Sequence, residues 1–69
     1  MALKIEFYRP KPRIEDWRVR YGEFTLGNVW RAAEGRYIAN CSHAETAPTA
    51  EAAFKLARRQ VKRIIAASR

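Results

Sequence analysis

The chain has few of the residues that build metal sites, disulfides or membrane spans. Its 69 residues include one cysteine, Cys41, and one histidine, His43. A lone cysteine cannot form an intrachain disulfide, and a zinc site requires three or four ligands. The sequence also lacks the uninterrupted apolar run of a signal peptide or a transmembrane helix. We therefore expect no metal, no cofactor, no membrane association and a cytoplasmic location.

Acidic residues are scarce relative to basic ones. Seven Asp and Glu stand against 14 Lys and Arg, which gives a formal net charge of +7 at pH 7. A positive field of this size attracts nucleic acid, an anionic membrane or an acidic protein surface. Net charge also keeps small proteins soluble without any partner. The expected partner is nucleic acid or an acidic protein surface.

The chain is too short to enclose a deep catalytic cleft. A domain of this length buries only about 60% of the surface that its unfolded chain exposes. Glu15 and Asp16 are adjacent, so on a strand their carboxylates point to opposite faces. Cys41 and His43 lie two residues apart, but Glu45 is a poor orienting acid for such a nucleophile pair. We predict that the protein is not an enzyme.

Period-two patterns predict an antiparallel sheet over residues 3–42. A first strand extends from Leu3 to Tyr8, and the prolines that follow indicate an exposed basic turn at 9–13. A second strand begins at Trp17 and continues through residue 26, with a bulge at Gly22-Glu23.

Two turn sequences predict the rest of the meander. Gly27-Asn28 and Glu34-Gly35 both suit the positive φ of two-residue hairpin turns. They delimit a third strand over 29–33 and a fourth over 36–42, and residues 43–48 are predicted to form a loop.

These two turns together fix a register between the strands. In that register Trp30 shares a face with Ala39 and Tyr37, and Val29 shares the other face with Ile38.

The most regular pattern in the chain predicts a C-terminal helix over 49–66. Thr49 suits the N-cap, because its hydroxyl can accept from free amides of the first turn. Apolar residues recur at helical spacing from Ala50 to Ile65, and this stripe must cover the sheet, since neither surface is buried alone. The predicted fold class is α+β, a single domain over 1–69 in which a three- to four-stranded antiparallel sheet packs against one amphipathic helix.

Two groups of basic residues are candidates for binding nucleic acid or an acidic partner. Cations dominate the exposed part of the helix, and arginines on neighbouring strands lie close in sequence to aromatic residues, a combination that grips phosphates and stacks on bases. Trp17 and Trp30 are expected in the core beneath the helix. Once the helix docks, the basic residues are expected to form one continuous surface. The candidates are Arg18, Arg20, Arg31, Arg36, Lys55, Arg58, Arg59, Lys62 and Arg63.

The sequence VWRAAEGRYIA at 29–39, followed by TAEAA at 49–53, resembles the arm-type DNA-binding domain of phage-like tyrosine recombinases. In that family a hairpin around a small-residue turn precedes an aromatic strand and a Thr-capped helix. The resemblance covers about half the chain and implies a three-stranded sheet inserted in the DNA major groove, with Arg31 and Arg36 reading or positioning DNA. The same half is similar in layout to part of a double-stranded-RNA-binding domain, but it lacks that family's Lys-rich helix start.

Small, basic, stand-alone α+β proteins are also typical of phages and mobile elements, and some of these inhibit a host complex that processes nucleic acid. Three functions therefore stay open. The first is a non-enzymatic nucleic-acid-binding protein, with DNA as the first expected ligand, that acts through phosphate contacts. The second is a phage or mobile-element inhibitor, similar to an anti-CRISPR protein, that binds an acidic protein surface. The third is a small structural homodimer. We predict the first.

Overall fold

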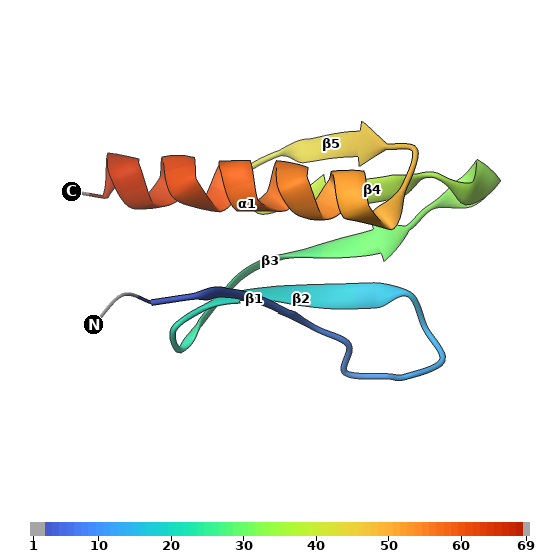
Figure 1. Ribbon diagram of the computed structural model, residues 1–69, viewed down its shortest axis with the longest axis horizontal. Helices are drawn as coiled ribbons and strands as arrows, with labels where there is room; N and C mark the ends of the chain where they lie inside the picture. Colours follow the sequence, from blue (N-terminus) through green and yellow to red (C-terminus); the bar gives the residue numbers. More distant parts are fainter. Residues whose placement is uncertain (1–2, 69) are drawn as a thin grey trace.

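In the computed structural model, which describes residues 3–68, one helix lies across one face of a five-stranded antiparallel sheet (Figure 1). The strands follow chain order across the sheet, so each pairs with the next. The α+β class is confirmed, with five strands in place of the predicted three or four. The elements are β1 (Ile5–Tyr8), β2 (Asp16–Tyr21), β3 (Phe24–Arg31), a 3₁₀ turn (Ala33–Gly35), β4 (Tyr37–Asn40), β5 (Ala44–Ala47) and α1 (Ala50–Ala67).

The turn between β2 and β3 lies at Gly22-Glu23, and the turn predicted at Gly27-Asn28 is wrong. Gly22 has a φ of 62°, and the residues on either side of the turn pair with each other. Gly27 lies inside β3, where a Cβ would overlap the carbonyl oxygen of Asn40 and lie 2.6 Å from the Cα of Cys41. This glycine therefore permits close approach of two backbones rather than a change of direction.

The loop between β3 and β4 is longer than the predicted two-residue turn. Arg31 pairs with Tyr37, which leaves residues 32–36 between the strands. Glu34 and Gly35 both have positive φ, 66° and 72°, within the 3₁₀ turn. The pair Glu34-Gly35 does reverse the chain, but three further residues take part in the loop.

The longer loop changes the register by one residue and exchanges the predicted faces. Val29 pairs with Ala39, and Trp30 pairs with Ile38. Because side chains alternate between faces, Val29 lies in the core beneath α1 and Trp30 lies on the opposite face. The expectation that Trp30 belongs to this core is therefore wrong, whereas Trp17 packs against it as predicted.

The segment 43–48, predicted as a loop, contains β5. This strand pairs with β4, with Glu45 opposite Ala39 and Ala47 opposite Tyr37. Apart from Thr46, its residues have little β-propensity, so no local pattern marks a strand. Tertiary contacts stabilise β5, because Ala47 is buried beneath α1.

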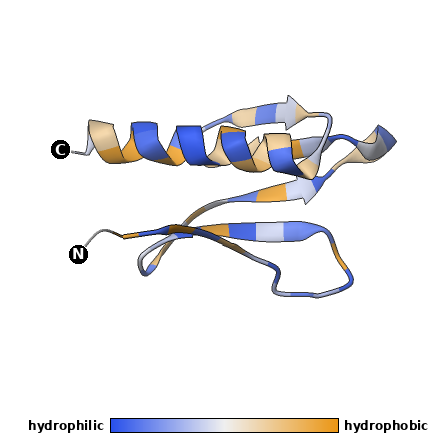
Figure 2. Ribbon diagram, viewed as in Figure 1, coloured by the Kyte–Doolittle hydropathy of each residue, from blue (hydrophilic) through white to orange (hydrophobic). Residues whose placement is uncertain are grey.

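The core lies between α1 and the face of the sheet that it covers. Thr49 caps the helix as predicted, with Ala52 N donating to Thr49 Oγ1 at 3.1 Å. The helix lies against β3, β4 and β5, and Phe54 reaches toward the first two strands, with its ring centroid 4.6 Å from Phe7 and 5.1 Å from Trp17. The bands of hydrophilic and hydrophobic residues along α1 match a helix that buries one side (Figure 2). The fully buried apolar residues are Val19, Val29, Ala39, Ala53, Ala57 and Val61. Ala47 is almost fully buried, with 5% of its surface exposed.

Replacing Gly27 by alanine is expected to destabilise the fold by about 3 kcal/mol, because an added methyl group collides with the backbone of β4 and the two strands must separate. The matched control is Gly35→Ala, where positive φ costs about 1–2 kcal/mol but a Cβ meets no atom within 4 Å. Urea denaturation of both variants measures the difference. Equal losses would contradict the close approach at Gly27.

Candidate nucleic-acid interface

The face of the sheet that α1 leaves uncovered carries a row of polar and aromatic side chains in register. Tyr8 pairs with Arg18, Arg18 with Asn28, and Asn28 with Asn40. Paired residues of antiparallel strands share a face, and this row points away from Val19, which is buried beneath α1. Strands lie about 4.8 Å apart, so the row extends for about 14 Å across four strands. We call Tyr8, Arg18, Asn28 and Asn40 the open-face row.

Arg20 and Trp30 flank the open-face row on the same face. The guanidinium carbon of Arg20 lies 5.5 Å from the centroid of the Tyr8 ring, a cation–π contact that orients both side chains. Trp30 lies between Asp16 and Ile38 across the sheet and is half-buried by its neighbours. This part of the surface therefore combines cations with two aromatic rings.

This face carries two arginines and two carboxylates, with Glu6 opposite Arg20 and Asp16 opposite Trp30. Within residues 3–68 neither Arg18 nor Arg20 forms an ion pair, and both are exposed. Guanidinium groups bind phosphates or guanine in a bidentate manner, asparagine amides pair with adenine, and aromatic rings stack on any base. Tyr8 is 40% exposed and so has room for such stacking.

The basic residues of α1 lie on the other side of the molecule. All five are exposed, and Arg58 lies over the Phe7 ring, 5.1 Å from its centroid, on the face that the helix covers. The expectation of one continuous cationic surface is therefore wrong, because the sheet separates this group from Arg18 and Arg20. The helix group comprises Lys55, Arg58, Arg59, Lys62 and Arg63.

Arg31 and Arg36 belong to neither group. Arg31 Nη1 donates to Glu15 Oε2 at 3.1 Å, and Tyr37 OH donates to the other carboxylate oxygen of Glu15 at 2.9 Å. The hydrogen bond to Glu15 raises the pKa of Tyr37 above its ordinary value. Arg36 is exposed in the loop between β3 and β4. Arg31 is thus engaged within the protein, at the end of β3.

The two asparagines of the open-face row are not recognisable from the sequence. Asn28 is predicted to lie in a turn, and nothing in the local pattern singles out Asn40. Only the pairing of β2, β3 and β4 places both beside Arg18. Only a correct prediction of the strand register would have identified Asn28 and Asn40.

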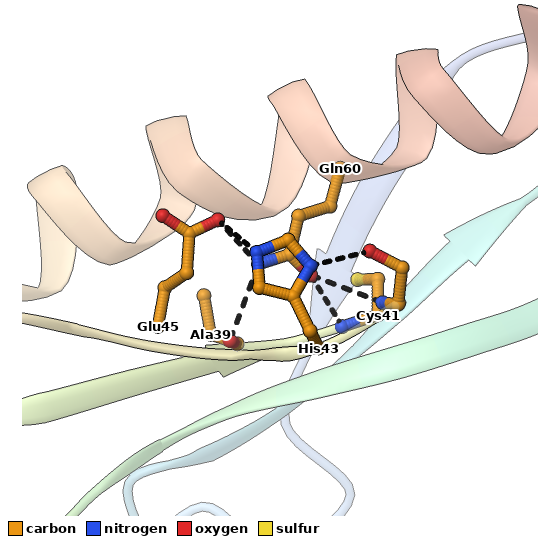
Figure 3. A network of polar contacts seen from close by, with 6 residues as sticks. Ala39, Cys41, His43, Glu45 and Gln60 are labelled. Atoms are coloured by element: carbon orange, nitrogen blue, oxygen red, sulfur yellow. Dashed lines mark hydrogen bonds and ion pairs between the residues drawn. The ribbon is translucent and has the colours of Figure 1, made fainter.

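A second polar cluster joins the β4–β5 turn to the helix (Figure 3). Gln60 is buried, and its Oε1 accepts from the amides of Cys41 at 2.7 Å and Ser42 at 3.1 Å. Its Nε2 donates to Glu45 Oε1 at 2.9 Å. The same carboxylate oxygen lies 3.0 Å from His43 Nε2. Each polar group of the Gln60 side chain therefore has a partner.

This cluster brings a hydroxyl, an imidazole and a carboxylate into contact. Ser42 Oγ lies 3.0 Å from His43 Nδ1, and Glu45 Oε1 lies 3.0 Å from His43 Nε2. The hydroxyl and the carboxylate thus contact opposite ring nitrogens, as in a Ser-His-Asp triad but with the two nitrogens exchanged. Acyl transfer also needs free donors for the oxyanion, and the nearest amides, those of Cys41 and Ser42, are bound to Gln60. Burial raises the pKa of the Cys41 thiol, which keeps it protonated and unreactive. The arrangement fastens the turn to α1.

Stability is expected to fall in acid through Glu45. The hydrogen bond from Gln60, followed by the charge of His43, holds the pKa of Glu45 below its ordinary value, although desolvation acts the other way. The folded state then binds fewer protons than the unfolded state, so the stabilisation is present above about pH 4.3 and is lost as the pH falls through the lowered pKa. Urea denaturation between about pH 6 and 3 should show a smaller loss for Glu45→Gln than for the unaltered chain. If the stability of both proteins depended on pH in the same way, Glu45 would not be the source of the loss in acid.

A shallow apolar hollow of about 350 Å³ lies beside the C-terminal end of α1. Tyr21, Phe24 and Leu26 line it from the β2–β3 hairpin, and Ile64 and Ile65 line it from the helix. Phe24 is 68% exposed at its edge. The hollow is thus an apolar surface on the same side of the molecule as the helix cations.

Comparisons of the chain with protein-family models, with curated proteins and with solved structures find no match. In the described part of the chain, no helix combines the length and apolar character needed to cross a membrane, and no three His, Cys, Asp or Glu side chains are grouped to hold a metal ion. The surface itself is therefore the basis for a functional assignment.

Proposed function

We propose that this protein binds nucleic acid without catalysing a reaction, with DNA as the first ligand to test, and that it does so on the uncovered face of the sheet. The observation that carries the proposal is the open-face row, Tyr8, Arg18, Asn28 and Asn40, which the register aligns across four strands. The aromatic rings beside this row stabilise the sheet through cross-strand contacts, and they also offer a surface on which bases can stack.

Phosphate contacts from Arg18 and Arg20 supply the attraction, and the neighbouring side chains contact bases and sugars. The cations of α1 strengthen the overall field but do not touch the same ligand. The molecule measures 15 Å along its shortest axis, and the Debye length is about 10 Å at 0.1 M salt, so charges on the far face are largely screened.

A salt titration tests the proposal. Fluorescence anisotropy of labelled DNA and RNA oligonucleotides should detect binding at about 50 mM salt, with the logarithm of the association constant falling linearly against the logarithm of salt concentration. Contacts to two or three phosphates predict a slope of about −2. No binding to DNA or RNA at about 50 mM salt would overturn the proposal.

A second candidate function, binding of an acidic protein as a phage or mobile-element inhibitor does, is favoured by the hollow beside Phe24. The hollow can take an apolar anchor, and the exposed cations of α1, among them Lys62 and Arg63, attract an acidic segment. A stoichiometric protein partner that resists nuclease treatment and is lost in Phe24→Ser supports this candidate. A homodimer through the same hollow would appear instead as a doubled mass in sedimentation velocity.

A further inference from the structure

We propose that the nucleic acid held on the open face is single-stranded, and that it lies across the strands with bases stacked on Tyr8 and Trp30. This inference rests on the proposed function and specifies its ligand class. It departs from insertion of the sheet into a duplex, which the resemblance to recombinase arm-type domains implies.

The width of the sheet argues against entry into a duplex. Five strands at about 4.8 Å spacing span about 19 Å between the outer strands. The major groove of B-DNA is about 12 Å wide and admits a helix or a two-stranded ribbon. Tyr8 and Asn40, at the ends of the open-face row, lie about 14 Å apart by strand spacing and cannot reach the floor of one groove together. A duplex resting on this face would offer phosphates to the arginines and leave the asparagines and aromatics unused.

The aromatic residues favour bases whose faces are accessible. Tyr8 is 40% exposed and is held by its contact with Arg20. Trp30 lies on the same face but outside the core cluster. Two strand spacings and two residues along the strand separate them, which amounts to about 12 Å. In a duplex each base face is covered by its neighbours, whereas in a single strand the bases can separate and stack on protein rings, as two or three bases do on RNA-binding sheets.

The asparagines of the open-face row suit the edges of unpaired bases. Asn28 and Asn40 each offer an amide donor and a carbonyl acceptor, so they can pair with any base whose Watson–Crick edge is free. Arg18 lies between Tyr8 and Asn28 in the row and is placed to contact the phosphate that joins two stacked nucleotides. The face thus combines stacking, charged and hydrogen-bonding groups across four strands.

Anisotropy measurements with three probes of one mixed sequence test the inference at about 50 mM salt: a 12-nucleotide DNA strand, the matching RNA strand, and a hairpin DNA duplex. A single strand should bind at least about tenfold more tightly than the duplex. Tyr8→Ala/Trp30→Ala should lose at least about 30-fold in single-strand affinity and change duplex affinity by less than about twofold. The relative affinities for the DNA and RNA strands show which type of nucleic acid the protein prefers.

Two variants control for loss of structure. Tyr8→Phe/Trp30→Phe keeps both rings and should retain most single-strand affinity, and Phe24→Ala removes an exposed aromatic from the other side of the molecule and should change nothing. Tighter binding of the duplex, or single-strand binding that a folded Tyr8→Ala/Trp30→Ala variant retains in full, overturns this inference and leaves the proposed function in place. No binding of any probe overturns both.

Discussion

Replacing Arg18 and Arg20 by glutamate is expected to weaken nucleic-acid binding at least about 100-fold, equivalent to about 3 kcal/mol. The change removes the two cations that face the ligand and adds two carboxylates to a face that already carries Glu6 and Asp16. Both arginines are exposed and form no ion pair within residues 3–68, but Arg20 lies opposite Glu6 and contacts the Tyr8 ring, so the change also costs about 1 kcal/mol of stability. Anisotropy with a single-stranded probe measures the loss, and circular dichroism checks the fold.

Lys62→Glu/Arg63→Glu is the matched control. Each reversal removes two units of charge, so both double variants have a net charge of +3 in place of +7. An effect of overall charge lowers the affinity of both variants equally, whereas contact on the open face affects only the first. Measured at about 0.1 M salt, the helix variant should lose less than about fivefold, because its cations lie across the sheet and are screened at that salt concentration. Equal losses, or a larger loss in the helix variant, would contradict a site on the open face.

Replacing Gln60 by leucine is expected to lower the free energy of unfolding by about 3 kcal/mol. Leucine fills a similar volume but leaves the amides of Cys41 and Ser42 without their acceptor, and Glu45 keeps only His43 of its two partners. Each buried polar group that loses its partner costs about 1–3 kcal/mol. A domain of this size has only about 3–10 kcal/mol of total stability, so thermal unfolding should shift downward by about 12–24 °C.

Ser42→Ala provides the comparison for this prediction. It removes the exposed hydrogen bond between Ser42 and His43 but keeps the amide that donates to Gln60, so it should cost less than about 0.5 kcal/mol. If Gln60→Leu were as mild as Ser42→Ala, the cluster would not be what holds the β4–β5 turn to the helix.

The elements with strong local periodicity could be predicted from the sequence. The apolar stripe from Ala50 to Ile65 and the cap at Thr49 define α1 within one residue at each end. The alternation around Trp17 and Val19 identifies the start of β2, but its predicted continuation through residue 26 with a bulge at Gly22-Glu23 is wrong, because β2 ends at Tyr21 and the chain turns there. In both cases one face is buried along the whole element, so the pattern of apolar residues follows the geometry directly.

The remaining errors arise where a local signal has two physical explanations. Gly27 before Asn28 suits a hairpin turn, but it also suits a strand whose backbone approaches another closely, and only the neighbouring strand decides between them. Ala44–Ala47 carries no pattern of its own, because the helix and β4 determine that it becomes a strand.

The candidate site could be predicted only in part for the same reason. Arg18 and Arg20 alternate with buried residues of one strand, so their common face follows from the sequence. Asn28 and Asn40 join them only through a register that depends on the loop 32–36, where Glu34 and Gly35 both take positive φ. The same register determines which face of the sheet α1 covers. The cations of α1 therefore lie on the opposite side of the sheet from Arg18 and Arg20.

A titration of isotope-labelled protein with the single-stranded probe, followed by amide and indole chemical shifts in NMR spectra, tests the central claim directly. The largest changes should fall at Tyr8, Arg18, Asn28 and Asn40 and at the indole of Trp30, with little change along α1. Changes concentrated between Lys55 and Arg63, with the uncovered face of the sheet unaffected, would contradict it.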